Sequence, residues 1–564
     1  MLRKIVWQTM GRKEVARTAS SSRSGFFQEA PNLGNQYEDD KALVSLVRRL
    51  IPAQTRQSMN LDEELHRCGA RVVARDILDA CEDAENNPPR HVPFDPWGHR
   101  VDKLVMAEGW KTMKRIAAEE GLISLAYDNQ FGEHARTYQF AKYFLFAPSS
   151  AVFTCPLAMA DGAARLIELL PQRSATLENA LRHLLSRDPA LAWTSGQWMT
   201  ERPGGSDVSR TETIAVPDPN STSYHISGFK WFSSATDSEM TLLLARLDDS
   251  PRLSLFFGHI HRPDGSGLNG IRIQRLKPKL GTKALPTAEL ELDGMEAELV
   301  GEPGRGVATI ATVLNITRVH TAVNAVSFLR RALAIADSFA SKRVAFGKLI
   351  KDHPLHKKTL WDLHAIYRQC LHLVFHTVAV LGRVEDASRR SDVNKEDELL
   401  LRLLTPVLKA WASKVSFAAI SECCEALGGA GYVEDVGIAR LLRDCQVLTI
   451  WEGTTNILSL DLRKLLVKDA AYKTAWTRFL SHLLQEVPVS PTKTAIEQRI
   501  NSVASQLDSF DESDARNVLF DIGETTSAVL LLAHAHATGD ADDLAFATFA
   551  CTGTYPLEIL RPRL

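Results

Sequence analysis

The sequence predicts a mainly α-helical protein with a small central antiparallel β domain and a helical C-terminal extension. Before about residue 190 and after about residue 305, apolar residues recur every three to four positions, which is typical of amphipathic helices. Between about residues 191 and 300 the apolar period falls to two, which is typical of strands. The chain has 564 residues, of which 45% are hydrophobic and 24% charged, as expected of a folded protein with several domains.

The charge and the cysteines exclude several classes of protein. The formal net charge is −2, so the chain as a whole lacks the basicity typical of nucleic-acid-binding proteins. The eight cysteines contain no C-x-x-C pair, so we predict buried, reduced thiols and no metal site. The apolar run at 528–533 is far shorter than the ~18 residues that span a bilayer, so no membrane span is predicted.

The two ends of the chain carry patterns typical of targeting signals. Residues 1–24 hold six basic residues against one acidic residue and are predicted to be a basic leader or a flexible tail; their composition resembles a mitochondrial transit peptide. The last three residues are Pro562, Arg563 and Leu564, which resemble a peroxisomal signal of the form small-basic-Leu, with proline as a departure. We therefore expect residence in the peroxisome, with the mitochondrial matrix or the cytoplasm as alternatives.

The N-terminal half divides into a helical domain and a β domain. Residues 25–190 are predicted to be helical; a helix is expected within 103–125, and four prolines at 88–96 predict a loop before it. The β domain is predicted for residues 191–300. Its expected strands lie at 224–232, 241–247, 253–260 and 288–293.

The C-terminal half is predicted to be helical throughout. Residues 301–470 are expected to form a helical bundle, because apolar stripes run from Leu360 to Leu381 and from Leu399 to Trp411. Residues 471–564 are predicted to be a helical extension, with loops near 487–492 and 536–543.

Five short motifs carry groups suited to binding or catalysis. Each has an ordinary structural explanation when taken alone: a turn, a core tryptophan, a solvated arginine at a helix end, a helix C-cap with glycine, or a turn-capping glutamate. The motifs are TERPGGSDV at 200–208, KWFSSATD at 230–237, RVAFGK at 343–348, EALGGAGYVED at 425–435 and IWEGTTNI at 450–457.

Glu452 is the candidate for acid–base chemistry. It lies between bulky apolar residues and a glycine, so its carboxylate is expected to be partly desolvated. Desolvation raises the pKa of a carboxylic acid toward the range useful to a general base.

Taken together, in this order and on this α–β–α layout, the motifs resemble the acyl-CoA dehydrogenase flavoprotein family over residues 25–470. The long N-terminal region and the C-terminal extension look most like its AidB-like branch, which includes bacterial alkylation-response proteins and long eukaryotic acyl-CoA dehydrogenases. The resemblance implies a fold of an α domain, a β domain and a four-helix-bundle domain. It also implies an oxidoreductase that acts on CH–CH groups with FAD as cofactor.

The resemblance assigns roles to residues of the first, second and fifth motifs. It implies that Glu452 is the catalytic base and that Arg318 is a buried arginine below it. It implies that Thr200 and Ser233 bond the flavin ring. By the same likeness, Met199 packs beside the ring, Trp231 flanks it, and Ser206 lies on the side of the flavin and acyl-CoA phosphates.

Further cofactor contacts are implied for the other motifs. Arg343 and Phe346 would reach the FAD of a neighbouring subunit, which implies a homodimer or homotetramer. Pro354, Glu425 and Asn456 stand where many relatives carry glutamine. The adenine and pyrophosphate end of FAD would be held by Glu425, Ala426, Leu427, Gly428, Gly429, Thr454 and Asn456.

The implied reaction is the α,β-dehydrogenation of an acyl-CoA thioester. Glu452 would remove the α proton while flavin N5 takes the β hydride, and the electrons would pass to an electron-transfer flavoprotein or to oxygen. Both β-oxidation and a biosynthetic side pathway are compatible with this chemistry.

Two other functions remain open in the sequence. One is a flavin oxidase of another acidic C–H compound such as a nitroalkane; that relative uses aspartate as its base, so Glu452 argues against it. The other is a DNA-binding protective protein like the bacterial alkylation-response members. The extension 471–564 has seven basic and twelve acidic residues, a net charge of 7 − 12 = −5, which makes DNA an improbable partner.

Overall fold

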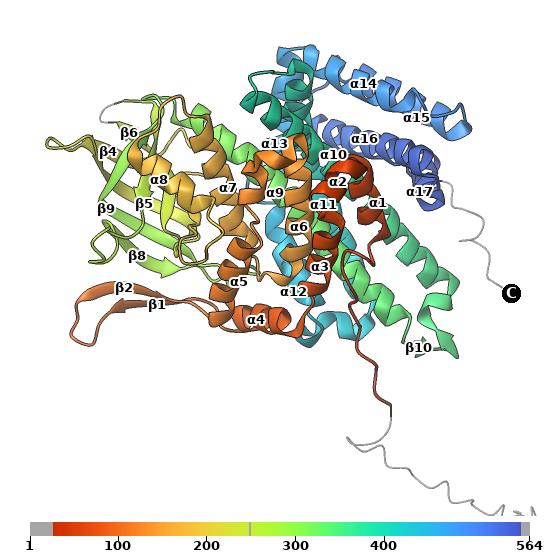
Figure 1. Ribbon diagram of the computed structural model, residues 1–564, viewed down its shortest axis with the longest axis horizontal. Coiled ribbons are helices and arrows are strands. Elements are labelled where there is room, and N and C mark those ends of the chain that lie inside the picture. Colours follow the sequence, from red (N-terminus) through yellow and green to blue (C-terminus); the bar gives the residue numbers. More distant parts are fainter. Residues whose placement is uncertain (1–25, 248–249, 554–564) are drawn as a thin grey trace, which may run out of the picture.

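The computed structural model describes residues 26–247 and 250–553. The predicted leader at 1–24 and the C-terminal tripeptide at 562–564 lie outside the described residues. Figure 1 shows most of the strands gathered at one side of the molecule and the long helices at the other, with shorter helices of the N-terminal region between them. The predicted fold class, mainly helical with a small β domain, is confirmed.

The N-terminal region contains eight helices among the described residues. All twelve residues of α6 are buried, so this helix has no solvent face and lies in the centre of the molecule. Helix α7 packs against α9 of the bundle and against β3 of the sheet, so it connects the two sides. The eight helices are α1 (Lys41–Leu50), α2 (Ala53–Ser58), α3 (Leu61–Arg71), α4 (Arg75–Asn86), α5 (Glu108–Glu119), α6 (Ala135–Phe146), α7 (Thr154–Leu169) and α8 (Ala175–Leu184).

A β-hairpin replaces the loop predicted at the proline-rich segment. Strands β1 (Arg90–Phe94) and β2 (Arg100–Val105) pair antiparallel, and α5 begins only at Glu108. The strands form because Pro93 falls at the irregularity between Val92 and Phe94, where the ladder does not require its missing N–H. The side chain of Asp95 accepts from two backbone N–H groups of the turn, which closes the hairpin.

The β domain is a seven-stranded sheet in which β7 pairs with both β6 and β9, so the path of strands closes on itself. Most pairs are antiparallel as predicted, but β3 and β4 each run parallel to β6, so the sheet is mixed. All four predicted strands are confirmed. The strands are β3 (Ser195–Trp198), β4 (Ile214–Pro217), β5 (Tyr224–Ser234), β6 (Met240–Leu247), β7 (Leu253–His259), β8 (Ile271–Leu276) and β9 (Thr287–Val300).

Three helices of 35, 36 and 32 residues form the body of the bundle: α9 (Gly306–Ala340), α10 (Pro354–Arg389) and α11 (Lys395–Ala426). Each packs against the other two, and both predicted apolar stripes lie inside α10 and α11. Two shorter helices, α12 (Ile438–Leu448) and α13 (Thr455–Lys468), pack on α11. A small hairpin of β10 (Val344–Ala345) and β11 (Lys348–Leu349) joins α9 to α10.

The extension adds four helices, drawn in blue in Figure 1. They are α14 (Ala471–Leu484), α15 (Pro491–Gln506), α16 (Ala515–Thr538) and α17 (Ala541–Thr552). The loop predicted near 487–492 is present, but the one predicted at 536–543 is reduced to a turn between α16 and α17. Helices α11 and α16 are long and apolar enough to cross a membrane, but 78% and 83% of their most apolar windows are buried inside the protein.

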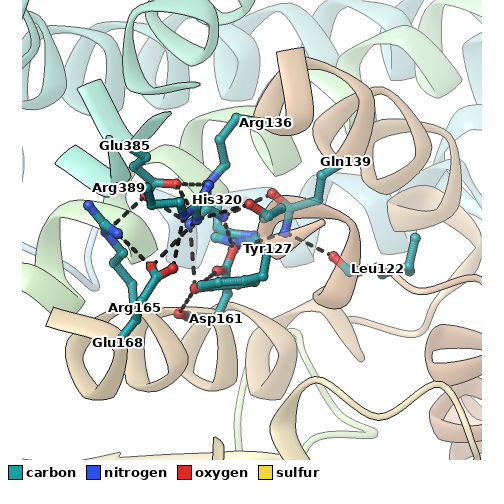
Figure 2. A network of polar contacts seen from close by, with 11 residues as sticks. Leu122, Tyr127, Arg136, Gln139, Asp161, Arg165, Glu168, His320, Glu385 and Arg389 are labelled. Atoms are coloured by element: carbon teal, nitrogen blue, oxygen red, sulfur yellow. Dashed lines mark hydrogen bonds and ion pairs between the residues drawn. The ribbon is translucent and has the colours of Figure 1, made fainter. Parts of the chain in front are cut away.

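A buried ion-pair network joins the N-terminal helices to the bundle (Figure 2). Arg136 of α6 lies 2.7 Å from carboxylate oxygens of both Asp161 on α7 and Glu385 on α10. His320 of α9 contacts the same oxygen of Asp161 at 2.6 Å. The network thus fixes α9 against α7 at a point one helical turn beyond Thr317, which belongs to the site described next.

Candidate active site

Glu452 occupies a strained turn between α12 and α13, residues 449–454, which we call the Glu452 turn. Its φ of +59° lies in the left-handed region that side chains other than glycine rarely adopt, and the following Gly453 has a φ of +102°. Such strain persists only where neighbours hold the backbone, and it is common at functional sites.

Two cationic side chains hold this turn by successive carbonyl groups. Arg318 of α9 donates from Nε to the carbonyl oxygen of Glu452 at 3.3 Å. Lys409 of α11 donates from Nζ to the carbonyl oxygen of Gly453 at 2.5 Å. Arg318 is held in turn by Asp461 of α13, at 3.3 Å, so the placement of the turn depends on α9, α11 and α13 together.

The carboxylate of Glu452 is oriented by a third group, the hydroxyl of Thr317, which donates to Oε2 at 2.6 Å. Burial raises the pKa of Glu452 above its ordinary value, although the Thr317 hydrogen bond and the charges of Arg318 and Lys409 pull it down. The prediction of a desolvated glutamate with a raised pKa is therefore confirmed. A glutamate with this environment is suited to remove a proton near neutral pH.

Lys409 carries an altered charge for the same reason. Burial lowers its pKa to about 7, although the nearby carboxylate of Glu452 works in the opposite direction. Near neutral pH the side-chain amine of Lys409 is therefore only partly protonated, and the electrostatic field at Glu452 depends on pH.

The residues predicted to contact the flavin ring lie in the β domain, at the ends of β3 and β5. The backbone N–H of Trp231 donates to the carbonyl oxygen of Thr200 at 2.9 Å, so the first two motifs are brought together. Between them, Lys230 and Glu201 form a buried ion pair at 2.7 Å that holds the strand to the loop. Lys277 Nζ lies 3.3 Å from the centroid of the indole ring of Trp231, a cation–π contact that fixes the ring.

Unpaired polar atoms in this region fit a bound cofactor. Ser233 Oγ and Thr236 Oγ1 are buried without a hydrogen-bond partner among the described residues. Gln197 Oε1 on β3 is unpaired as well. A buried polar group without a partner is unfavourable, so these atoms are suited to a ligand that carries donors and acceptors. Ser233 is the residue for which the resemblance implies a bond to the flavin ring.

The other two residues predicted near the ring lie on the same loop. Met199 is half-buried and packs on the main core, whereas Ser206 is exposed. At Gly205 a Cβ atom would lie 2.7 Å from Thr200 Oγ1, so only glycine leaves this hydroxyl free.

The residues predicted to hold the adenine and pyrophosphate lie at two helix ends. Glu425, Ala426 and Leu427 lie at the C-terminal end of α11, and Leu427 is buried whereas Glu425 is exposed. Gly428 follows with a φ of +60° and open space around its Cα. Gly429, next along the chain, is also exposed with open space.

Thr454 and Asn456 lie at the N-terminal end of α13. Thr454 is the N-cap residue and makes no side-chain capping hydrogen bond, so first-turn N–H groups remain available to an anion. Asn456 is exposed, and its Oδ1 accepts from Arg516 of α16 at 3.2 Å, which links the predicted cofactor site to the extension.

Arg343 and Phe346 are not brought to the other predicted residues within one chain. Both belong to the β10–β11 hairpin at the end of α9. The side chain of Arg343 contacts the segment before α1, with Nη1 3.4 Å from Gln28 Oε1 and its guanidinium over the ring of Phe26. Phe346 is 97% exposed and has a φ of +49°. Their position is compatible with the predicted role toward a neighbouring subunit.

Sequence reasoning missed Thr317 and Lys409. Both lie inside long helices whose apolar pattern predicts core, and neither belongs to a motif. A buried lysine within an apolar stripe was the one available signal, since lysine is almost never fully buried without a partner.

Comparison with known proteins identifies the family to which this architecture belongs. Three family models match in order: the adaptive response protein AidB N-terminal domain over residues 29–188, the acyl-CoA dehydrogenase middle domain over 196–295, and the acyl-CoA dehydrogenase C-terminal domain over 304–466.

Individual relatives agree with the models. The chain is 41% identical over 540 residues to acyl-CoA dehydrogenase family member 11 of Caenorhabditis elegans, and the match covers 91% of this chain and 86% of that protein. It is 31% identical over 454 residues to the putative acyl-CoA dehydrogenase AidB of Escherichia coli, covering 79% of this chain and 80% of that protein. The crystal structure of Caenorhabditis elegans ACDH-11 in complex with C11-CoA matches with a TM-score of 0.89 at 38% identity, covering 96% of this chain and 95% of that chain. The protein therefore belongs to the acyl-CoA dehydrogenase family, in its AidB-like branch.

Proposed function

We propose that this protein dehydrogenates the Cα–Cβ bond of an acyl-CoA thioester, with FAD as its cofactor and Glu452 as the base that removes the α proton. As a member of its family it is an oxidoreductase that acts on CH–CH groups. The observation that carries the proposal is the carboxylate of Glu452, half-buried on a strained turn and oriented at 2.6 Å by Thr317. The complex of the Caenorhabditis elegans relative with C11-CoA supports an acyl-CoA as the substrate class.

The residues that would hold FAD are those with free polar atoms. Ser233, whose hydroxyl is unpaired, and Thr200, whose hydroxyl faces Gly205, are suited to the ring, and the N-terminal end of α13 at Thr454 is suited to the pyrophosphate. When bound, FAD supplies the two-electron acceptor for the β hydride.

The chain itself supplies a base with a defined direction. Because Thr317 occupies Oε2 of Glu452, the other oxygen, which has no hydrogen-bond partner among the described residues, is available to take the proton. Partial burial keeps the carboxylate poorly solvated and therefore more basic than a surface glutamate. Arg318 and Lys409 prevent the turn from relaxing, so the carboxylate keeps its position as its charge changes.

The test is the rate at which an acyl-CoA bleaches the flavin under anaerobic conditions, followed by stopped flow. Glu452→Gln keeps shape and volume but removes the base, so the protein should fold and bind FAD while flavin reduction falls by at least ~10²–10⁴-fold. Glu452→Asp keeps the charge but draws the carboxylate back, so its loss should be intermediate. Glu178→Gln, exposed on α8 and outside the five motifs, is the control and should reduce at the wild-type rate. If the flavin of Glu452→Gln is bleached at the wild-type rate, the base lies elsewhere in the chain.

The electron acceptor separates this function from that of a flavin oxidase. We propose a dehydrogenase, so the reduced enzyme should reoxidise slowly in air and rapidly with an electron-transfer flavoprotein. Rapid reoxidation by oxygen, together with turnover of a nitroalkane, would favour the oxidase instead.

A further inference from the structure

Three ionisable side chains meet where the C-terminal extension packs on the bundle. They are His372 of α10, His534 of α16 and Asp543 of α17. All three side chains are fully buried, and Asp543 Oδ2 lies 3.4 Å from His372 Nε2 and 3.6 Å from His534 Nε2. The cluster shares no residue with the candidate active site.

Four of the six polar side-chain atoms of this cluster are left unpaired; the other two are His534 Nε2, which contacts Ser45 Oγ, and Asp543 Oδ1, which accepts from Arg368. His372 Nδ1 and Nε2, His534 Nδ1 and Asp543 Oδ2 have no hydrogen-bond partner among the described residues. Buried groups in folded proteins are nearly always satisfied by protein, by water or by an ion. Four unsatisfied atoms on three neighbouring residues therefore indicate an occupant.

The spacing of the ligand atoms matches a metal ion. Two ligands that each lie ~2.1 Å from a tetrahedral ion are about 3.4 Å apart, close to the two separations measured here. One ligand atom from each residue lies within 4.8 Å of the other two. The rings of His372 and His534 are 4.7 Å apart and inclined at 67°, so they approach Asp543 from different directions.

Neighbouring polar groups also bear on the site. Arg368 donates to Oδ1 of Asp543, which orients the carboxylate and leaves Oδ2 free. Ser45 Oγ lies 2.9 Å from His534 Nε2, at hydrogen-bond distance, so an ion bound at this nitrogen would replace that hydrogen bond.

Two arginines face the cluster. Arg368 pairs with Asp543 and also contacts Asp540 and Asp542, at 3.4 and 3.5 Å. Arg49 interacts with His534, and Glu486 is the acidic group that acts on Arg49. The charge of Arg368 is thus matched by carboxylates, whereas Nη1 of Arg49 is buried without a hydrogen-bond partner among the described residues.

We propose that His372, His534 and Asp543 bind one divalent transition-metal ion, which fastens α16 and α17 to α10. Two imidazoles and one carboxylate form a ligand set that favours Zn²⁺. The absence of a C-x-x-C pair does not bear on this site, because its ligands are histidine and aspartate from distant parts of the chain. The role is structural, since the ligands are fully buried and belong to three different helices. The proposal does not depend on the proposed function.

The first experiment uses the full-length wild-type protein with its FAD. After exhaustive dialysis, elemental analysis should find about one zinc per chain. Treatment with a strong chelator should remove it and lower the melting temperature, and ZnCl₂ should restore both. CoCl₂ added to the chelated protein should give the visible bands of a four-coordinate cobalt site. Zinc well below one per chain, with neither a rise in melting temperature on adding ZnCl₂ nor cobalt bands, would overturn the proposal.

Variants locate the ion. His534→Gln and Asp543→Asn should each lose the bound zinc and the response of the melting temperature to ZnCl₂. The matched control is His376→Gln, because His376 stacks on His372 one turn along α10 but lies outside the ligand set; it should keep one zinc. FAD absorbance per chain reports folding, because the extension can loosen while the cofactor stays bound. Full zinc content in both ligand variants would show that the metal lies elsewhere.

Discussion

The hydroxyl of Thr317 donates a hydrogen bond of 2.6 Å to the carboxylate of Glu452, which lies 135 residues further along the chain. The next residue of α9, Arg318, binds the carbonyl oxygen of the same glutamate. One turn of α9 therefore controls both the backbone and the side chain of the candidate base. His320, on that same turn, is locked by Asp161 in the buried network of Figure 2, which connects the placement of the base to the core.

We expect Thr317→Val to slow flavin reduction while FAD content stays normal. A hydrogen bond to a charged group contributes about 1.5–3 kcal/mol, so the rate constant should fall roughly 10- to 100-fold if the bond is needed for positioning. Thr317→Ser keeps the hydroxyl and should recover most of the rate. If the serine variant is as slow as the valine variant, the hydroxyl is not what positions Glu452.

The rate of flavin reduction should rise with pH, with an apparent pKa above the ordinary 4.5 of glutamate. Burial raises the pKa of Glu452, and only the deprotonated carboxylate can accept the α proton, so activity is lost as pH falls through this raised value. Single-turnover rates over a pH series test this. An apparent pKa at or below 4.5 would contradict the assigned environment.

Lys409→Met should move this profile to higher pH. The ammonium of Lys409 lowers the pKa of Glu452, so removing it raises that pKa further. Lys414→Met, on the same helix, is the control and should leave the profile in place. A profile that does not move in Lys409→Met would show that the field at Glu452 has another source.

The β10–β11 hairpin should be needed for assembly. We expect a dimer or tetramer by light scattering, with Phe346→Ala shifting it toward the monomer because this ring is 97% exposed in one chain. Trp97→Ala, at the tip of the β1–β2 hairpin and 84% exposed, is the matched aromatic control.

Arg343→Lys should weaken FAD retention, because an ammonium cannot replace the planar fork of guanidinium. A wild-type monomer that holds FAD tightly would contradict the assignment of both residues.

The buried network should dominate stability. Arg136→Met leaves Asp161 and Glu385 buried without their cation, so the free energy of unfolding should fall by about 3–5 kcal/mol in urea titrations at pH 7. Arg390→Met, which removes an exposed pair with Asp386, should change it by no more than ~1 kcal/mol. Equal effects of the two substitutions would mean that the network is not a stabilising unit.

The same network predicts that the stability of the protein falls at acidic pH. Burial alone raises the pKa of Asp161, but Arg136 and His320 outweigh it and hold that pKa well below the ordinary 3.8. This contribution to stability is present above the unfolded pKa and is lost as pH falls through the lower folded value. Wild type should therefore lose more stability than Arg136→Met between pH 6 and pH 3.

Duplex DNA should not bind with useful affinity at ~150 mM salt, because the chain has a net charge of −2 and phosphate contacts dominate such binding. Electrophoretic mobility shifts over a salt series measure this. Binding near ~10⁻⁸ M at physiological salt, the range of specific DNA-binding proteins, would overturn the charge argument despite the likeness to AidB.

The sequence by itself determined the fold class, the family and the candidate base. Apolar periods of 3.6 and two are local properties, so the stripes of α10 and α11 and the strands of the β domain could be read directly from the chain. Glu452 was a candidate because its neighbours in the motif predict partial desolvation, and its role as the catalytic base was implied by the resemblance to the family. The hairpin at 90–105 was missed because its pairing depends on a partner strand and on the bulge at Pro93.

Only the tertiary structure decided which groups surround Glu452 and which side chains meet beneath the extension. Thr317 and Lys409 reach the Glu452 turn from two different helices, and their neighbours in sequence give no sign of it. His372, His534 and Asp543 likewise come from three helices that only the packing of the extension brings together. The physical reason is that hydrogen bonds and ion pairs act over a few ångströms in space, whereas sequence patterns report only which face of an element is buried.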